Sequence, residues 1–265
     1  MTLETNVEIA GISLFCRTDG PGSGAPWIIF SNSLVTDLTI WDAQVDALGG
    51  RYNLLRYDQR GHGRSGSSKD TLTFDRLGDD VLALLDHFNI QTCSFVGLSM
   101  GVPTGLRAYQ QDPARFDRLV FVDGMARTAP TGSAAWQERI DFVAQNGMDR
   151  FAEATVGRWL QPDSLQSSKG KTLIAMVAAT PENGFVQCAT ALQGYDYADV
   201  VPRINIPLLA IAGAEDGAMP VAMEKTFGVV PGAQIATIAK AGHVPNFERP
   251  DAFNAKLIKF LDQIG

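Results

Sequence analysis

Gly97-Leu98-Ser99-Met100-Gly101 places a serine between two glycines, directly after a short apolar run. The run Cys93-Ser94-Phe95-Val96 predicts a buried strand, and residues 102–111 predict a helix. A side chain at either glycine would collide with the neighbouring strand or helix, and the serine between them must adopt a strained backbone conformation. A serine at such a strand-to-helix turn is typical of an enzymatic nucleophile. The alternative is a solvated serine in an ordinary turn.

Two later residues complete a set around Ser99. Asp216 follows a predicted strand at 208–213, and His243 follows a weaker one at 235–238. The carboxyl ends of parallel strands share one edge of a sheet, so residues far apart in sequence can meet there. The order serine, acid, histidine is that of α/β-hydrolases. His243 would take the serine proton, and Asp216 would hold the imidazole in the required tautomer.

The acid has a second candidate. Asp123 ends the predicted strand 118–122, and an acid at that place reaches the histidine in some α/β-hydrolases. Position favours Asp216, although Glu215-Asp216-Gly217 is also a good turn sequence. His62 lies among glycines and arginines in a loop, and we expect it to be a structural hydrogen-bond partner.

Two main-chain N–H groups are expected to form an oxyanion hole. Met100 follows the serine, so its N–H points at whatever the hydroxyl attacks. Asn32-Ser33 follows the predicted strand 27–30, where many serine hydrolases have a His-Gly turn. Leu34 would then supply the second N–H. The alternative is an ordinary strand–helix loop with an Asn turn.

The alternation of strands and helices predicts an α/β-hydrolase fold, with a mostly parallel central sheet flanked by helices. A hairpin of two predicted strands, at residues 7–9 and 12–16, opens the sheet. Helical patterns, with breakers at Gly147, Pro162 and Pro181, interrupt the alternation from about residue 126 to residue 201. We therefore expect a core formed by residues 1–125 and 202–265, with residues 126–201 inserted as a helical cap.

The composition narrows the classes of partner. The 265 residues carry a net charge of −7, which argues against nucleic acid and anionic membranes. The three cysteines are widely spaced and no secretory segment is visible, so we expect reduced thiols in the cytoplasm. The three histidines lack metal-ligand spacing, and we expect neither a metal nor a cofactor. The expected partner is a small-molecule substrate, and the expected state is a monomer or small homo-oligomer.

Further motifs are spread along the chain, namely Ser31-Asn32-Ser33-Leu34, Arg60-Gly61-His62-Gly63, Arg158-Trp159, Thr180-Pro181-Glu182, Gly213-Ala214-Glu215-Asp216 and Asn246-Phe247-Glu248. With the serine motif, they resemble those of 3-oxoadipate enol-lactonases over almost the whole chain. The resemblance implies cofactor-free hydrolysis of a small acidic enol-lactone formed during aromatic breakdown. The cap would then bind the substrate carboxylate, for which the candidates are Trp136, Arg139, Arg158 and Trp159. Surface charge and cap packing are the alternative roles of these four residues.

Three departures from the family pattern lie around the expected pocket. Val102-Pro103 replaces the glycine that usually follows Gly101, Val35 replaces a glycine after Leu34, and Asp123-Gly124-Met125 replaces Asn-Thr-Ala. These changes leave two other hypotheses open. One is an amide, formamide or carbon–carbon bond hydrolase that uses the same residues. The other is a ligand-binding protein without catalysis, against which the complete serine–histidine–acid set argues.

Overall fold

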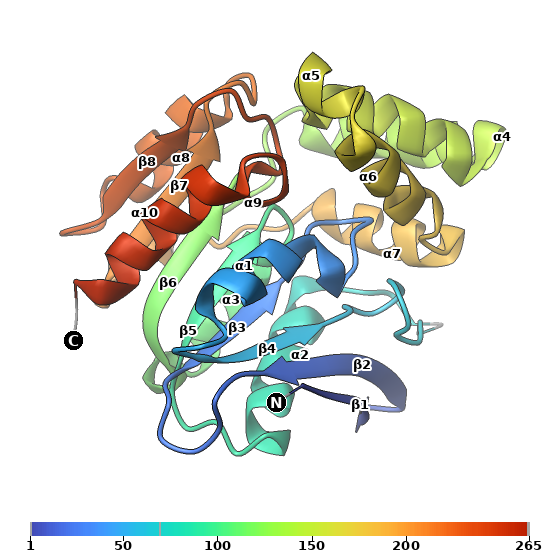
Figure 1. Ribbon diagram of the computed structural model, residues 1–265. Helices are drawn as coiled ribbons and strands as arrows, with labels where there is room; N and C mark the ends of the chain where they lie inside the picture. Colours follow the sequence, from blue (N-terminus) through green and yellow to red (C-terminus); the bar gives the residue numbers. More distant parts are fainter. Residues whose placement is uncertain (1, 69, 264–265) are drawn as a thin grey trace.

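The structure is a computed structural model that describes residues 2–68 and 70–263 (Figure 1). Eight strands form one sheet in the order β1-β2-β4-β3-β5-β6-β7-β8. Their bounds are β1 Leu3–Ile9, β2 Ile12–Asp19, β3 Trp27–Ser31, β4 Asn53–Tyr57, β5 Cys93–Leu98, β6 Phe116–Val122, β7 Leu208–Gly213 and β8 Gln234–Ile238. The β1–β2 and β2–β4 pairs are antiparallel, and the other five pairs are parallel. The predicted fold class, an α/β-hydrolase fold with a mostly parallel sheet, is confirmed.

Helices cover both faces of the sheet because successive strand residues point in opposite directions. Ile28 of β3 packs in the same cluster as Phe253, whereas Ile29 packs with Val81 on the other face. One face is covered by α1 (Asp42–Leu48) and α10 (Pro250–Asp262). The other face is covered by α2 (Phe74–His87), α3 (Gly101–Gln111) and α8 (Met219–Phe227). The central strands are therefore buried on both sides, as their continuous apolar runs predict.

Four helices lie between β6 and β7 in the chain and sit together beyond one end of the sheet (Figure 1). They are α4 (Gly132–Trp159), α5 (Pro162–Leu165), α6 (Ser168–Ala178) and α7 (Glu182–Leu192). Gly147 breaks α4 into two arms with a φ of 75°, at the position where the sequence predicts a helix breaker. The assignment of residues 126–201 as a separate cap stays a prediction.

Two of the remaining elements are not predicted by the sequence pattern. Helix α8 buries only Met223 and Phe227 fully, while Val221 is 71% exposed, so its apolar pattern is weak. The short helix α9 (Pro245–Glu248) directly follows the loop that carries His243. Three 3-10 turns complete the connections, η1 (Leu38–Trp41), η2 (Pro113–Arg115) and η3 (Val201–Arg203).

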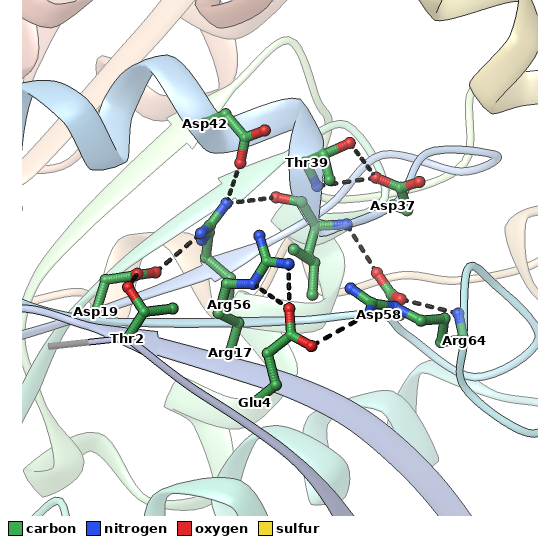
Figure 2. Close-up of polar contacts among 11 residues, drawn as sticks. Thr2, Glu4, Arg17, Asp19, Asp37, Thr39, Asp42, Arg56, Asp58 and Arg64 are labelled. Atoms are coloured by element: carbon green, nitrogen blue, oxygen red, sulfur yellow. Dashed lines mark hydrogen bonds and ion pairs between the residues drawn. The ribbon is translucent and has the colours of Figure 1, made fainter.

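A polar network holds the loop between β3 and η1 against the sheet (Figure 2). Asp58, just after β4, accepts hydrogen bonds of 2.8 Å from the Leu38 N–H and 2.9 Å from the Arg64 N–H. Arg56 of β4 is buried and forms ion pairs with Asp19 and Asp42. These contacts fix the path of the loop that includes Leu34.

In residues 2–68 and 70–263, no helix combines the length and the apolar character that crossing a membrane would require. All three cysteines are free thiols and all are buried, so each fills space in the core.

Candidate active site

Ser99 occupies the sharp turn between β5 and α3. Its φ is 53°, in the left-handed region that only a strongly constrained serine adopts. Its N–H donates a 2.7 Å hydrogen bond to the carbonyl of Val122 on β6. A Cβ atom at Gly97 would lie 2.4 Å from the carbonyl oxygen of Gly101, and one at Gly101 would lie 2.5 Å from that of Ser31. Both flanking glycines are therefore required by close backbone contacts, as the motif predicts.

His243 lies between Ser99 and Asp216. Its Nε2 is 3.0 Å from the Ser99 Oγ, and its Nδ1 is 2.8 Å from the Asp216 Oδ2. A carboxylate can only accept, so Nδ1 holds the hydrogen and donates it to Asp216. Nε2 is left to accept the hydroxyl proton of Ser99. The geometry thus joins the three residues in one hydrogen-bonded chain.

The environment keeps Asp216 ionised. Burial acts to raise its pKa, but the charge of His243 and hydrogen bonds from His243 and Asp123 outweigh burial and lower it. The ionised carboxylate can therefore stabilise the positive charge that His243 gains when it takes a proton.

Asp123, the second candidate acid, lies behind Asp216 and is fully buried. Its two carboxyl oxygens lie 3.0 and 3.1 Å from the N–H of Gly213, and its side chain shares a hydrogen bond with Asp216. Potential metal-ligating atoms of Asp123, Asp216 and His243 lie within 4.8 Å of one another. Both ring nitrogens of His243 already have a hydrogen-bond partner, Asp216 and Ser99.

The loop after β3 lines the same cavity as Ser99. Leu34 lies in it, and Val35 beside it has a φ of 58°, a conformation that disfavours a branched residue. The N–H of Val35 donates a 2.9 Å hydrogen bond to Nε2 of His62, whose Nδ1 lies 3.0 Å from the Arg60 carbonyl. Burial lowers the pKa of His62 to about 4, so the ring is neutral and accepts this bond at Nε2. His62 is therefore a structural hydrogen-bond partner that supports the loop.

A cavity of about 490 Å³ brings every predicted site residue together. Its lining includes Ser99, Asp123, Asp216, His243, Leu34, Met100, Trp136, Arg139, Arg158 and Trp159. The catalytic candidates line it from the strand ends, and α4 closes it from above. The roles of these residues belong to the proposal below.

Two arginines of α4 give the cavity a positive wall. The guanidinium of Arg139 lies 4.4 Å from the ring centre of Trp136, a cation–π contact. Burial, and next the nearby charge of Arg158, lowers the pKa of Arg139. Two neighbouring cations, of which Arg139 is half-buried and Arg158 is exposed, create a favourable position for an anionic group.

Several residues of the lining were not among the sequence candidates, and two of them carry polar groups of note. Arg127 and Tyr195 both contribute to the cavity, and both lie outside the helical pattern of the insertion. The hydroxyl of Tyr195 donates to the carbonyl of Met125 over 3.3 Å, which ties the start of the insertion to its end. One feature of the sequence could have indicated Arg127, namely that it is a cationic residue shortly after the predicted strand that ends at Val122.

Known proteins resemble this chain over nearly its whole length. The family model described as alpha/beta hydrolase fold matches residues 21–250. The 3-oxoadipate enol-lactonase 2 of Acinetobacter baylyi is 34% identical over 231 residues and covers 86% of each chain. The crystal structure of the enol-lactonase from Burkholderia xenovorans LB400 matches with a TM-score of 0.92 and 33% identity, over 97% of this chain and 100% of that one. A protein of Agrobacterium fabrum, named provisionally as the carbamate hydrolase RutD, is 26% identical over 92% of this chain and 95% of its own.

Proposed function

The chain belongs to the alpha/beta hydrolase fold family, and we propose that it opens a small anionic enol-lactone or a similar ester through an acyl-enzyme on Ser99. The observation that supports this most is the hydrogen-bonded chain from Ser99 through His243 to Asp216 at the base of the cavity. A serine hydroxyl is a weak nucleophile unless a base stands beside it. Here His243 is the base, and it contacts the Ser99 hydroxyl. Its hydrogen bond to Asp216 fixes the tautomer of its ring.

In the first step, the Ser99 Oγ attacks the substrate carbonyl while Nε2 of His243 takes the hydroxyl proton. The carbonyl oxygen becomes negatively charged and lies against the N–H groups of Met100 and Leu34. Each such donor contributes about 3 kcal/mol to the transition state. Asp216 stabilises the imidazolium during this step.

Collapse of the tetrahedral intermediate breaks the ring C–O bond. The enolate leaves with little help from an acid and takes a proton from solvent water at carbon to become a ketone, while His243 releases to solvent the proton that it took from Ser99. A water molecule then attacks the acyl-enzyme as His243 takes a proton from it, and His243 passes this proton to the Ser99 Oγ when the free acid leaves. These steps use the chain's own residues and water.

The substrate class is inferred from the wall of the cavity. Arg139 and Arg158 would pair with a carboxylate, while Trp136 and Trp159 would cover the apolar part of a small ring. A volume of about 490 Å³ suits a molecule of this size. Enol-lactonases at 33–34% identity support the same class. A cytoplasmic location is part of the proposal, since three free thiols fit a reducing compartment.

A substrate panel tests the proposal. The purified protein is assayed with 3-oxoadipate enol-lactone, a neutral lactone of equal ring size, an aryl ester, an N-alkyl carbamate and a formamide. We expect the anionic lactone to have the highest kcat/KM, about 10-fold or more above the neutral lactone, because of its charge-assisted hydrogen bonds. Turnover of the carbamate or the formamide with both lactones untouched would reject the lactonase proposal and favour an amide-type hydrolase.

A further inference from the structure

Two carboxyl groups lie in contact behind His243. One carboxyl oxygen of Asp123, one of Asp216 and a ring nitrogen of His243 all lie within 4.8 Å of one another, and hydrogen bonding between the two carboxyl groups raises the pKa of Asp123 and lowers that of Asp216. Asp123 is 0% exposed, whereas the side chain of Asp216 is 19% exposed. The proposed mechanism uses Asp216 and leaves Asp123 without a task.

The backbone of strand β7 holds Asp123 in place through two of its residues. The φ of Asp123 is 41°, a left-handed conformation that aspartate tolerates better than most residues. Its N–H donates a 3.0 Å hydrogen bond to the carbonyl of Ile211, and its carboxyl group accepts from the N–H of Gly213. The side chain is therefore fixed in one orientation, directed at Asp216.

Two carboxyl groups in hydrogen-bond contact hold one proton between them, because two adjacent anions repel each other. The proton belongs on Asp123. Burial, and next the negative charge of Asp216, raises the pKa of Asp123 well above its usual value. Asp216 faces the imidazole of His243, which stabilises its charged form.

We infer that Asp123 is a positioning residue, which in its neutral form donates a hydrogen bond to Asp216 and so fixes the carboxylate that orients His243. This inference rests on the proposed function and adds a second acid to its machinery. Asp216 then accepts from two sides, from His243 in front and from Asp123 behind.

The inference predicts a dependence on pH. The ionisable groups that act on Asp123 are Asp216 directly and His243 through it. When Asp123 loses its proton at alkaline pH, the donor disappears and two anions face each other. Asp216 then loses its orientation, and the reactivity of Ser99 falls.

The test measures the rate at which a fluorophosphonate modifies Ser99, between pH 5 and pH 11, and needs no substrate. The variants are Asp123→Asn and Asp123→Leu. An asparagine amide can donate to Asp216 and accept from the Gly213 N–H, whereas leucine can do neither. Glu215→Gln is the matched control, because it removes one negative charge from an exposed position on the loop of Asp216.

We expect the wild-type rate to fall at alkaline pH, where Asp123 loses its proton. Asp123→Asn should lack this alkaline fall. Asp123→Leu should react about 10-fold more slowly or worse at every pH, since its Asp216 lacks the second partner. Glu215→Gln should follow the wild-type profile.

An alkaline fall that persists unchanged in Asp123→Asn would overturn the inference. This comparison is enough even if Asp123→Leu does not fold. A folded Asp123→Leu protein that reacts at the wild-type rate would also overturn it. Failure of the wild-type protein to react at any pH would reject the proposed function as well, which distinguishes the two failures.

Discussion

The N–H of His243 donates a 3.0 Å hydrogen bond to the carbonyl oxygen of Trp159, the last residue of α4. The two rings lie 5.1 Å apart. A Cβ atom at Gly242 would lie 2.1 Å from the same carbonyl oxygen, so only glycine permits this approach. The loop that positions the candidate base is therefore attached directly to the helix that closes the cavity.

Glu248 strengthens this attachment. Its carboxylate accepts 2.7 Å hydrogen bonds from the N–H of Gly242 and from that of Gln161, just past α4. Glu248→Gln places an amide NH₂ against one of these donors. We expect about 2 kcal/mol less stability and about 10-fold lower kcat, because a buried charge-assisted bond is lost. Denaturation and steady-state kinetics measure both effects.

Glu224→Gln on the exposed face of α8 is the matched control and should change neither quantity. A Glu248→Gln protein with unchanged stability and kcat would show that the carboxylate does not hold the His243 loop.

Removal of the nucleophile or the base should abolish turnover. Ser99→Ala and His243→Ala should each lower kcat by about 10⁴-fold to 10⁶-fold, and the double variant should be little worse, because the two residues act as one unit. Circular dichroism should show an intact fold in each. Retention of a substantial part of kcat by either single variant would contradict the assignment.

The same substitution, aspartate to asparagine, distinguishes the roles of Asp216 and Asp123. Asp216→Asn should lower kcat by about 10⁴-fold, because an amide cannot hold the imidazole in the required tautomer. Asp123→Asn should have a far smaller effect at neutral pH, since an amide can replace a neutral carboxyl group as a donor. The measurement is kcat of both variants on one substrate. A larger loss of kcat in Asp123→Asn than in Asp216→Asn would make Asp123 the acid that orients His243.

The arginines should affect binding of charged substrates only. Arg139→Gln and Arg158→Gln should each raise KM for an anionic lactone by about 10-fold to 100-fold, with little change for a neutral ester. Arg150→Gln is the matched control, since Arg150 is an exposed residue of the same helix and is paired with Glu153. Equal effects on charged and neutral substrates would indicate a packing role instead.

His62 should make stability depend on pH. Its pKa is lowered from 6.5 to about 4 by burial, so the unfolded chain takes up a proton in this window while the folded protein does not. Stability contributed by neutral His62 is therefore lost as the pH falls from 6.5 towards 4. When the pH is lowered from 6.5 to 4.5, the free energy of unfolding of the wild-type protein should fall by about 2 kcal/mol more than that of His62→Asn.

Urea denaturation at the two pH values measures this difference, and comparing changes within each protein removes any general effect of the substitution. His87→Asn, at an exposed position of α2, should behave like the wild type. An equal loss in the wild type and in His62→Asn would contradict a neutral, buried His62.

The sequence was informative wherever a local rule limits the backbone. The glycines around Ser99 and the break at Gly147 could both be predicted, because each position demands a conformation or a contact that other residues resist. Helix α8 could not be predicted, since it buries too few side chains to show a period. A sequence pattern therefore reveals a helix or strand only when that element buries enough side chains to make the pattern regular.

The sequence predicted which residues form the site better than it predicted the contacts between them. The ends of parallel strands bring Ser99, Asp216 and His243 to one edge. The sequence could not show that Asp123 contacts Asp216 from behind, because that depends on the register of β6 against β7. Nor could it show that Arg127 and Tyr195 reach the cavity, since irregular segments place them there.

The most direct test is a mass measurement on protein treated with a fluorophosphonate at neutral pH. We predict one adduct per chain, mapped by peptide sequencing to Ser99, with complete loss of turnover and no adduct in the Ser99→Ala protein. Turnover that continues with Ser99 fully modified, or an active protein that forms no adduct there, would contradict the account.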